Sequence, residues 1–177
     1  MKKHKIVLLL ALITLIVFSI YVIYSSDKYR EIESTDLSQE SIGGLSLMDK
    51  YNKVDIEKKF GQLTNEYKKN SSYIYEFQSQ KGILFLKVDK DNNIVRIELQ
   101  FKDSSIETDR GMTKVSTFYD ITEAYGNKYL KEENKDFMGR REYKEISYVD
   151  KKIMSKISFM LYEYEDWTLG HVVLSRY

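Results

Sequence analysis

The most acidic and aromatic stretch of the chain lies near its C-terminus, at residues 162–167 (Tyr-Glu-Tyr-Glu-Asp-Trp). Glycoside hydrolases use two carboxylic acids, one as the general acid and the other as a base or nucleophile. Glu163, Glu165 and Asp166 are therefore candidates for such a pair in an envelope hydrolase. The same pattern is typical of a strand that ends in a charged turn, and this is the preferred interpretation.

Asp89, Asp91 and Asn93 have the spacing of the first ligands of a calcium-binding loop. Such a loop requires Gly at its sixth position and Glu at its twelfth, and this chain has Ile94 and Gln100 there. The sequence therefore predicts a turn between two strands. We expect neither a metal nor a cofactor.

His171 lies in the apolar segment Thr-Leu-Gly-His-Val-Val-Leu and is the one histidine beyond residue 24. A histidine can act as a general base, but a Ser-His-Asp arrangement needs partners that sequence alone does not place. The chain has no cysteine, which excludes disulfides, thiolate zinc sites and cysteine nucleophiles. We therefore expect a structural histidine and a protein that is not an enzyme.

The charge of the chain argues against nucleic-acid binding. Without the three lysines among its first five residues, the chain carries 25 basic and 27 acidic residues, a net charge of about −2. A nucleic-acid-binding protein needs a basic face to neutralise phosphates. The 15 tyrosines and eight phenylalanines favour half-buried, pleated surfaces, so we expect much β-structure.

Two segments combine aromatic or apolar side chains with charge and are predicted to contact a partner. Residues 137–141 (Phe-Met-Gly-Arg-Arg) place two apolar side chains before a basic pair, in an expected loop. They follow residues 128–135, which are mixed in charge and expected to be solvated. With the C-terminal acidic stretch, the predicted contact residues are Phe137, Arg140, Arg141, Tyr162, Tyr164 and Trp167.

The first predicted element of the chain is an apolar run from Ile6 to Tyr24, which contains no charge. At about 1.5 Å per residue it forms a helix of roughly 28 Å, close to the thickness of a bilayer core. The lysines before it predict a cytoplasmic N-terminus. The run is longer than that of a signal peptide, and bulky residues occupy the position of a cleavage site. We therefore predict a single-pass cell-membrane protein that contacts the bilayer through residues 6–24, with an extracellular C-terminal domain.

Two parts of the remaining chain resemble each other. Residues 40–46 and 107–113 share the pattern Glu-[Ser/Thr]-x-x-Gly-[Leu/Met]-[Ser/Thr], and residues 55–61 and 120–126 both run from Asp-Ile to an aromatic residue and Gly. Before each of these glycines, apolar residues fall near helical spacing. Each copy is therefore predicted to contain a helix that ends at a glycine in a left-handed conformation.

Strands are expected after each helix, because apolar and aromatic residues recur in short segments between turn residues. Short connections favour an antiparallel meander with helices on one face. The predicted fold class is α+β: a transmembrane helix, then two copies of a helix plus antiparallel β-meander unit. The expected strands are 73–77, 82–88, 94–101, 141–149, 153–164 and 167–175. The expected boundaries are 1–5 (cytoplasmic), 6–24 (transmembrane), 25–39 (linker), 40–104 (first repeat) and 105–177 (second repeat).

This pattern resembles the tandem α/β repeat of the β-lactamase inhibitor protein and of the small outer-membrane assembly lipoproteins that share its unit. It is also similar to anchored extracytoplasmic proteins of low-GC Gram-positive bacteria. The resemblance covers about residues 40–177 and implies a binding or envelope-assembly module. The inhibitor family usually carries disulfides and this chain has no cysteine, so no binding residue is transferred.

The preferred function is a membrane-anchored, extracytoplasmic protein-interaction or envelope-associated module without catalysis. Its expected partner is a protein or a cell-envelope component. Two alternatives stay open: the envelope hydrolase with acids near Glu163, and an immunity or stress-response membrane protein that guards its own cell.

Overall fold

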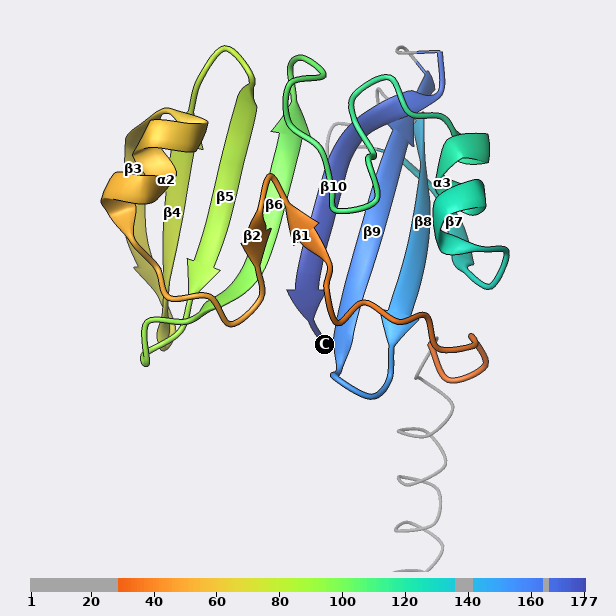
Figure 1. Ribbon diagram of the computed structural model, residues 1–177, viewed down its shortest axis with the longest axis horizontal. Coiled ribbons are helices and arrows are strands. Elements are labelled where there is room, and N and C mark those ends of the chain that lie inside the picture. Colours follow the sequence, from red (N-terminus) through yellow and green to blue (C-terminus); the bar gives the residue numbers. More distant parts are fainter. Residues whose placement is uncertain (1–28, 136–141, 164–165) are drawn as a thin grey trace, which may run out of the picture. The chain divides into compact units, whose positions relative to one another are not determined.

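The computed structural model describes residues 29–135, 142–163 and 166–177. The chain divides into two compact units, Met1–Glu31 and Ile32–Tyr177. All described helices and strands belong to the second unit (Figure 1). Its main feature is one eight-stranded antiparallel sheet with the strand order β3-β4-β5-β6-β10-β9-β8-β7.

The described elements are two short helices, a two-stranded ribbon and the eight strands of the sheet. The ribbon is β1 (Ser41–Ile42) and β2 (Leu45–Ser46), and the helices are α2 (Lys53–Phe60) and α3 (Phe118–Tyr125). The strands are β3 (Gln62–Lys69), β4 (Ser72–Gln78), β5 (Gly82–Val88), β6 (Ile94–Phe101), β7 (Leu130–Lys135), β8 (Glu142–Asp150), β9 (Ser155–Tyr162) and β10 (Thr168–Arg176).

Both helices begin at a residue whose side chain accepts hydrogen bonds from the first turn. In α2 this residue is Asn52. In α3, Thr117 and Asp120 form a reciprocal capping box. Each helix ends at the predicted glycine, Gly61 or Gly126, with φ of 95° or 90°. The positive φ agrees with the prediction, but ψ near 180° differs from that of the left-handed helical region. Both glycines therefore lie in a region of positive φ and extended ψ that is open almost only to Gly.

The two glycines provide a matched pair of stability predictions. A non-Gly residue in such a conformation costs about 1–3 kcal/mol. We expect Gly126→Ala to lower the free energy of unfolding by this backbone cost alone, because an added Cβ there would meet no atom within 4 Å. Gly61→Ala is expected to cost more, because its Cβ would clash with the Gln78 carbonyl oxygen. Equilibrium urea denaturation measures both, and equal losses would contradict the clash.

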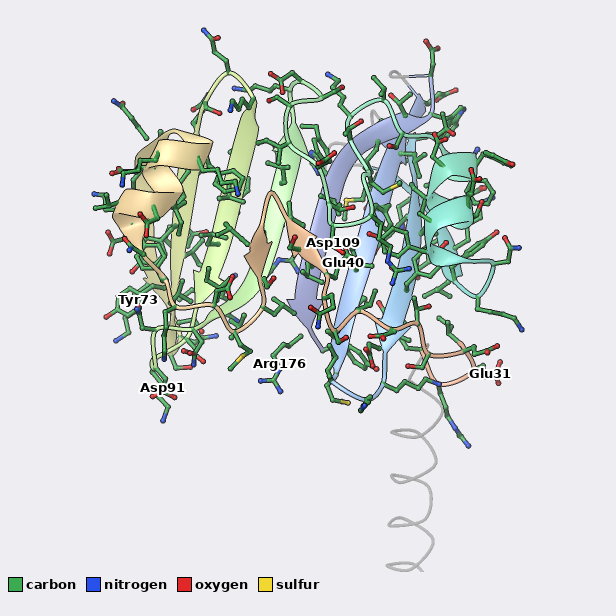
Figure 2. The ribbon with its side chains drawn as sticks, viewed as in Figure 1. Glu31, Glu40, Tyr73, Asp91, Asp109 and Arg176 are labelled. Atoms are coloured by element: carbon green, nitrogen blue, oxygen red, sulfur yellow. The ribbon has the colours of Figure 1, made fainter. Side chains whose placement is uncertain are left out.

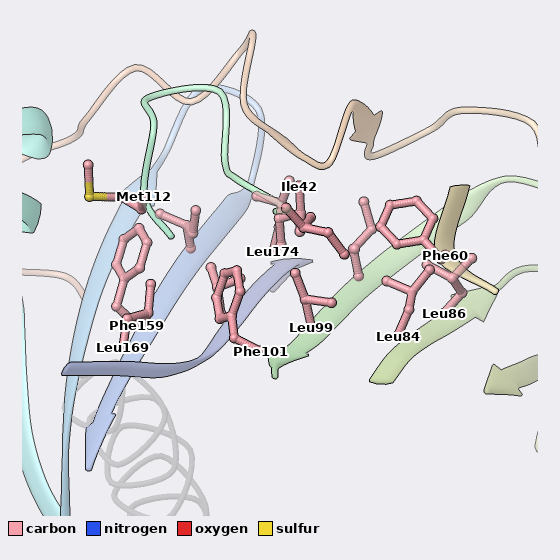
Figure 3. Close-up of a cluster of buried hydrophobic side chains, with 14 of the residues drawn as sticks. Ile42, Phe60, Leu84, Leu86, Leu99, Phe101, Met112, Phe159, Leu169 and Leu174 are labelled. Atoms are coloured by element: carbon pink, nitrogen blue, oxygen red, sulfur yellow. The ribbon is translucent and has the colours of Figure 1, made fainter. Parts of the chain in front are cut away.

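The core lies on one face of the sheet, beneath α2, α3 and the ribbon (Figures 1 and 3). Along each strand every second side chain points to this face. Phe60 of α2 and Ile42 of the ribbon pack against it, as does Tyr125 of α3. The strands contribute a continuous band of buried side chains: Phe77, Leu84, Leu86, Ile97, Leu99, Ile146, Tyr148, Ile157, Phe159, Val172 and Leu174.

The predicted fold class, α+β with two helix-plus-meander units, is wrong. The strands form one continuous sheet, because β6 pairs directly with β10 through neighbours such as Leu99↔Val172 and Ile97↔Leu174. These residues belong to one buried cluster, so the core is shared along the sheet. Strand residues also greatly outnumber those of the two eight-residue helices. The described chain is therefore mostly β.

The predicted transmembrane helix, and with it the single-pass, cell-membrane localisation, is also corrected. Within residues 29–135, 142–163 and 166–177, no helix has the length and apolar character needed to cross a bilayer. Residues 6–24, on which the prediction rested, lie outside the described residues.

The two edge strands, β3 and β7, were not predicted from the sequence. All side chains of β3 except Leu63 are exposed, so the segment lacks the alternation of apolar and polar residues that marks a strand. Residues 130–135 were expected to be solvated, yet they pair with β8 from Leu130↔Ser147 to Lys135↔Glu142. Edge strands form through backbone hydrogen bonds and tolerate charged side chains, which explains both omissions.

Candidate functional site

The face of the sheet opposite α2 and α3 is called the open face here. On its β3–β6 half lies a hollow of about 440 Å³, within the size range of ligand sites. We call it the open-face hollow. It is lined by Tyr67, Lys69, Asn70, Ile74, Phe85, Leu86, Lys87, Arg96, Glu98 and Gln100.

Strand register brings the lining residues together. Ile74, Lys87 and Arg96 are consecutive neighbours across β4, β5 and β6. Phe85 and Glu98 lie opposite each other in the next row, and cross-strand neighbours share a face. Side chains from four strands therefore converge on one surface.

The open-face hollow combines apolar contact area with positive charge. Tyr67 is 48% exposed, and Ile74 and Phe85 are half-buried. Arg96 is paired with Glu98 at 2.9 Å between Nη2 and Oε2, which leaves Lys69 and Lys87 as an excess of basic groups in the lining. Apolar side chains beside lysines suit an acidic ligand with apolar or aromatic groups.

His171 borders this hollow, because β10 pairs with β6 through His171↔Gln100. Its Nδ1 lies 3.2 Å from the Tyr162 hydroxyl, and the two rings pack edge to face with centroids 5.2 Å apart. Burial lowers the pKa of His171, and the negative charge of Glu98 opposes this effect only in part. His171 is therefore held mainly as a neutral side chain that supports Tyr162.

The lowered pKa of His171 predicts a pH-dependent stability. As the pH falls below about 6.5, His171 binds a proton more readily in the unfolded chain than in the folded chain. The free energy of unfolding therefore decreases. We expect wild type to lose stability relative to His171→Gln over this range, and the two to respond alike above it. Urea denaturation from pH 5 to pH 8 measures the difference, and parallel curves throughout would refute the prediction.

Of the six predicted contact residues, the structure places two. Tyr162 is buried against His171, at 7% exposure, and it also packs against the Tyr143 ring. Trp167 is half-buried, with the Lys144 ammonium group 3.6 Å from its ring centroid. Both side chains are thus largely used in packing. The other four, Phe137, Arg140, Arg141 and Tyr164, lie outside the described residues.

The candidate acids near Glu163 belong to the connection between β9 and β10. Glu163 and Asp166 are exposed, and the Asp166 N–H donates to the Glu163 carbonyl oxygen at 3.1 Å. This hydrogen bond confirms the turn interpretation. Glu165 lies outside the described residues, so the hydrolase alternative stays an untested prediction.

The Asp89 turn is confirmed as a connection between β5 and β6. The Asp89 Oδ1 accepts hydrogen bonds from the backbone N–H groups of Asp91 and Asn93, both at 2.9 Å. These bonds hold the pKa of Asp89 below its usual value. The carboxylate is used in turn formation, and the described residues contain no cluster of three metal-ligating side chains.

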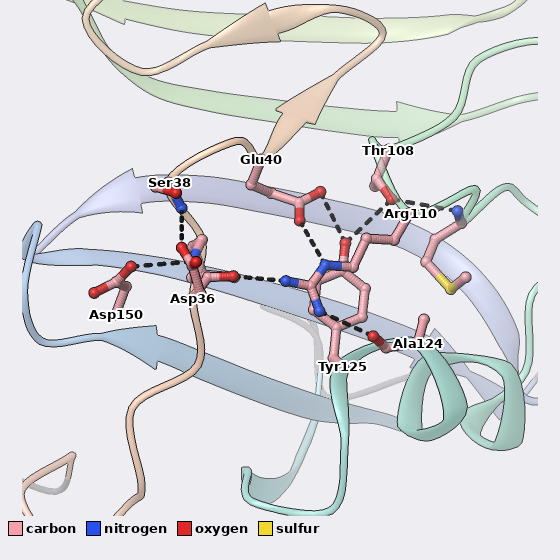
Figure 4. Close-up of polar contacts among 10 residues, drawn as sticks. Asp36, Ser38, Glu40, Thr108, Arg110, Ala124, Tyr125 and Asp150 are labelled. Atoms are coloured by element: carbon pink, nitrogen blue, oxygen red, sulfur yellow. Dashed lines mark hydrogen bonds and ion pairs between the residues drawn. The ribbon is translucent and has the colours of Figure 1, made fainter.

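A second polar site, which the sequence did not indicate, lies beneath the N-terminal segment (Figure 4). The buried Glu40 carboxylate accepts a hydrogen bond from the Tyr125 hydroxyl at 2.8 Å and lies 3.5 Å from Arg110 Nε. Arg110 also donates to the carbonyl oxygens of Ala124 and Asp36, at 2.9 and 2.6 Å. We call Glu40, Arg110 and Tyr125 the buried triad; through Asp36 it ties the N-terminal segment to α3.

Burial dominates the electrostatics of the buried triad. It raises the pKa of Glu40, and the Tyr125 hydrogen bond and the Arg110 charge counteract this only in part. The pKa of Tyr125 is also raised, mainly by burial and next by the Glu40 charge. The Arg110 guanidinium stacks 4.4 Å from the centre of the Tyr125 ring. With every member engaged, the cluster is a structural connection.

Comparison with known proteins does not assign the chain to a family. No protein-family model matches it, and no curated protein matches it. One similar solved structure is a cysteine-rich secretory protein from Staphylococcus aureus, with 12% identity and a TM-score of 0.46 over 70% of this chain and 42% of that one. Another is a DUF4309 family protein from Bacillus subtilis, with 18% identity and a TM-score of 0.45 over 76% and 83%.

Neither description names an enzymatic activity. The chain spans less than half the length of the staphylococcal protein, and similarities at these TM-scores carry no argument about function. The resemblance to the β-lactamase inhibitor repeat is tested by neither comparison and stays a prediction.

Proposed function

We propose that this chain is a protein-interaction module that binds an acidic segment of a partner protein in the open-face hollow. The observation that carries the proposal is the meeting of Tyr67, Ile74 and Phe85 with Lys69 and Lys87 in one hollow. Aromatic side chains are typical of the residues that dominate binding energy at interfaces, and the basic neighbours add electrostatic complementarity to an acidic partner.

The size and charge of the hollow define the partner segment. A volume of about 440 Å³ holds a few side chains, so the partner enters with a loop or a short extended segment. The excess of basic groups favours Asp or Glu in that segment, and the exposed ring of Tyr67 favours an adjacent apolar side chain. Binding of this kind requires no catalytic step.

Site-specific photocrosslinking in cells tests the proposal. A photoreactive phenylalanine analogue replaces Phe85 in the hollow or, as the control, Tyr119 of α3, which is 71% exposed and far from the open face. We expect a discrete adduct from position 85 and none of the same size from position 119. The same adduct from both positions, or none from position 85, would refute a partner at this surface.

Charge reversal then tests the acidic character of the partner. Lys87→Glu is expected to reduce the adduct from position 85, because it places a negative charge beside Phe85. Lys58→Glu is the matched control, since Lys58 lies on α2 with 73% of its side chain exposed. Equal adduct yields from the two variants would show that the partner segment is not acidic.

A further inference from the structure

A separate pocket lies where the N-terminal segment crosses the ends of β9 and β10, on the core side of the sheet. Its volume is about 290 Å³, near the lower limit for small-molecule sites. Its apolar walls are Leu37, Leu47, Met48, Ile153 and Leu174. We call it the strap pocket, because residues 37–48 form one side of it.

The strap is fixed to the sheet by hydrogen bonds at both ends. The Leu37 N–H donates to Asp150 Oδ2 at 3.0 Å, and the Met48 N–H donates to the Ile94 carbonyl oxygen at 2.8 Å. Met48 has φ of 72° and is 47% exposed. A non-Gly residue in this region is energetically costly and persists only where its surroundings enforce it. The pocket wall is therefore preformed.

The wall contains a buried hydroxyl group without a partner. Ser155 is 1% exposed, and among the described residues no group forms a hydrogen bond with its Oγ. Leaving such a group unpaired costs free energy that a ligand oxygen would recover. The neighbouring lining is largely apolar, so Ser155 provides a specific polar contact.

Arg176 supplies a positive charge in the same pocket lining. Ser155 and Arg176 are opposite each other in the β9–β10 pair, so their side chains share a face. Arg176 Nη1 contacts the Met48 sulfur at 3.7 Å, and within the described part of the chain no carboxylate lies within ion-pair distance of the guanidinium. Figure 2 shows Arg176 at the end of β10.

The acidic residue in the pocket lining is already engaged. This residue is Glu40, whose oxygens face the Tyr125 hydroxyl and Arg110 Nε. The positive charge of Arg110 offsets the negative charge of Glu40, so Arg176 is the charged lining residue without an opposite charge in an ion pair among the described residues.

We propose that the strap pocket binds a small amphipathic carboxylate, such as a medium-chain fatty acid. The apolar chain lies among Leu37, Leu47 and Leu174, and the carboxylate accepts hydrogen bonds from the Arg176 guanidinium and the Ser155 hydroxyl. This site is independent of the open-face hollow, so its test does not depend on the proposed protein partner.

Methyl NMR of the full chain labelled with ¹³C-methyl methionine tests the site. Octanoate, kept below its self-association concentration, is expected to shift the Met48 methyl signal in a saturable manner. Met112 in the core and Met160 on the open face serve as internal references. Octanol and octylamine are expected to bind at least about fivefold more weakly, because neither can pair with Arg176. No saturable Met48 shift, or equal binding of the three probes, would overturn the proposal.

Two variants separate ligand contact from a structural role. Arg176→Gln is expected to weaken octanoate about fivefold and leave octanol unchanged. Lys58→Gln, which removes an exposed positive charge on α2, is the control. Ser155→Ala is expected to raise the thermal midpoint of the free protein while weakening octanoate. Loss of octanoate binding in Lys58→Gln to the same degree, or unchanged octanoate binding in both pocket variants, would contradict the assignment.

Discussion

Replacing Arg110 with Met is expected to lower the free energy of unfolding by about 3–5 kcal/mol at pH 7. Met retains an apolar stem over the Tyr125 ring but removes the charge that faces the buried Glu40 carboxylate, whose side chain is 1% exposed. The carbonyl oxygens of Ala124 and Asp36 also lose their donor. Urea denaturation measures the loss.

Arg96→Met is the control for loss of an ion pair. Arg96 is paired with Glu98, but its side chain is 43% exposed, so we expect a cost below about 1 kcal/mol. Equal losses from Arg110→Met and Arg96→Met would mean that burial of the Glu40 pair has no special importance.

The charge of Glu40 gives the Arg110 prediction a second readout. Removing Arg110 takes away one of the three contacts that favour the ionised carboxylate, so the pKa of Glu40 rises further. An acid with a raised folded-state pKa costs stability as the pH rises above its unfolded value. The difference in the free energy of unfolding between wild type and Arg110→Met is therefore expected to become smaller from pH 7 to pH 4. In the double variant, Glu40→Gln is expected to recover part of the stability that Arg110→Met loses at pH 7. If the effects of the two substitutions on the free energy of unfolding simply add, Glu40 and Arg110 are not energetically coupled, which would contradict the prediction.

The second large effect is expected for Phe159→Ala, which should lower the free energy of unfolding by about 3–5 kcal/mol. Phe159 is fully buried at the centre of β9. Its ring packs against Tyr125 and Tyr148, with centroids 4.9 and 6.4 Å away. Removal of the ring leaves a cavity between α3 and the sheet. If the Ala variant does not fold, Phe159→Leu provides a smaller truncation for the same urea measurement.

Phe85→Ala is the matched control, since Phe85 lies in a central strand but is half-buried on the open face. We expect a smaller loss of stability than for Phe159→Ala, because the site opens to water and leaves no enclosed cavity. Comparable losses for the two phenylalanines would show that the open face is as tightly packed as the core, which would contradict its assignment as a binding surface.

Local sequence patterns predicted the helix ends and the central strands. Asp55-Ile56 and Asp120-Ile121 each precede an aromatic residue and a glycine, and both helices end there. Residues 82–88 and 94–101 form β5 and β6 as expected. Helix caps and apolar alternation depend on neighbours within a few residues, so the sequence shows them directly.

The candidate sites depend on contacts that no local pattern shows. Phe85 and Arg96 of the open-face hollow lie on different strands and meet through register. Glu40 and Arg110 are far apart in the sequence but adjacent in the buried triad. Tyr162 and Trp167, which were predicted as partner contacts, also pack against His171 and Lys144 within the fold. The sequence did not show this packing, because an aromatic residue in or beside a strand has no sequence mark that separates packing from binding.

Three properties can be read from the sequence alone: the chain has no cysteine chemistry, turns occur at Asp89 and Glu163, and helices end at Gly61 and Gly126. These properties follow from composition or from hydrogen bonds between near neighbours. The arrangement of the strands in one sheet rather than two units is visible only in the folded chain, because a single β6–β10 pairing joins the two halves. Such pairing forms between distant backbone groups that every sequence carries, so the shared core, the open face and the strap pocket emerge only when the chain is folded.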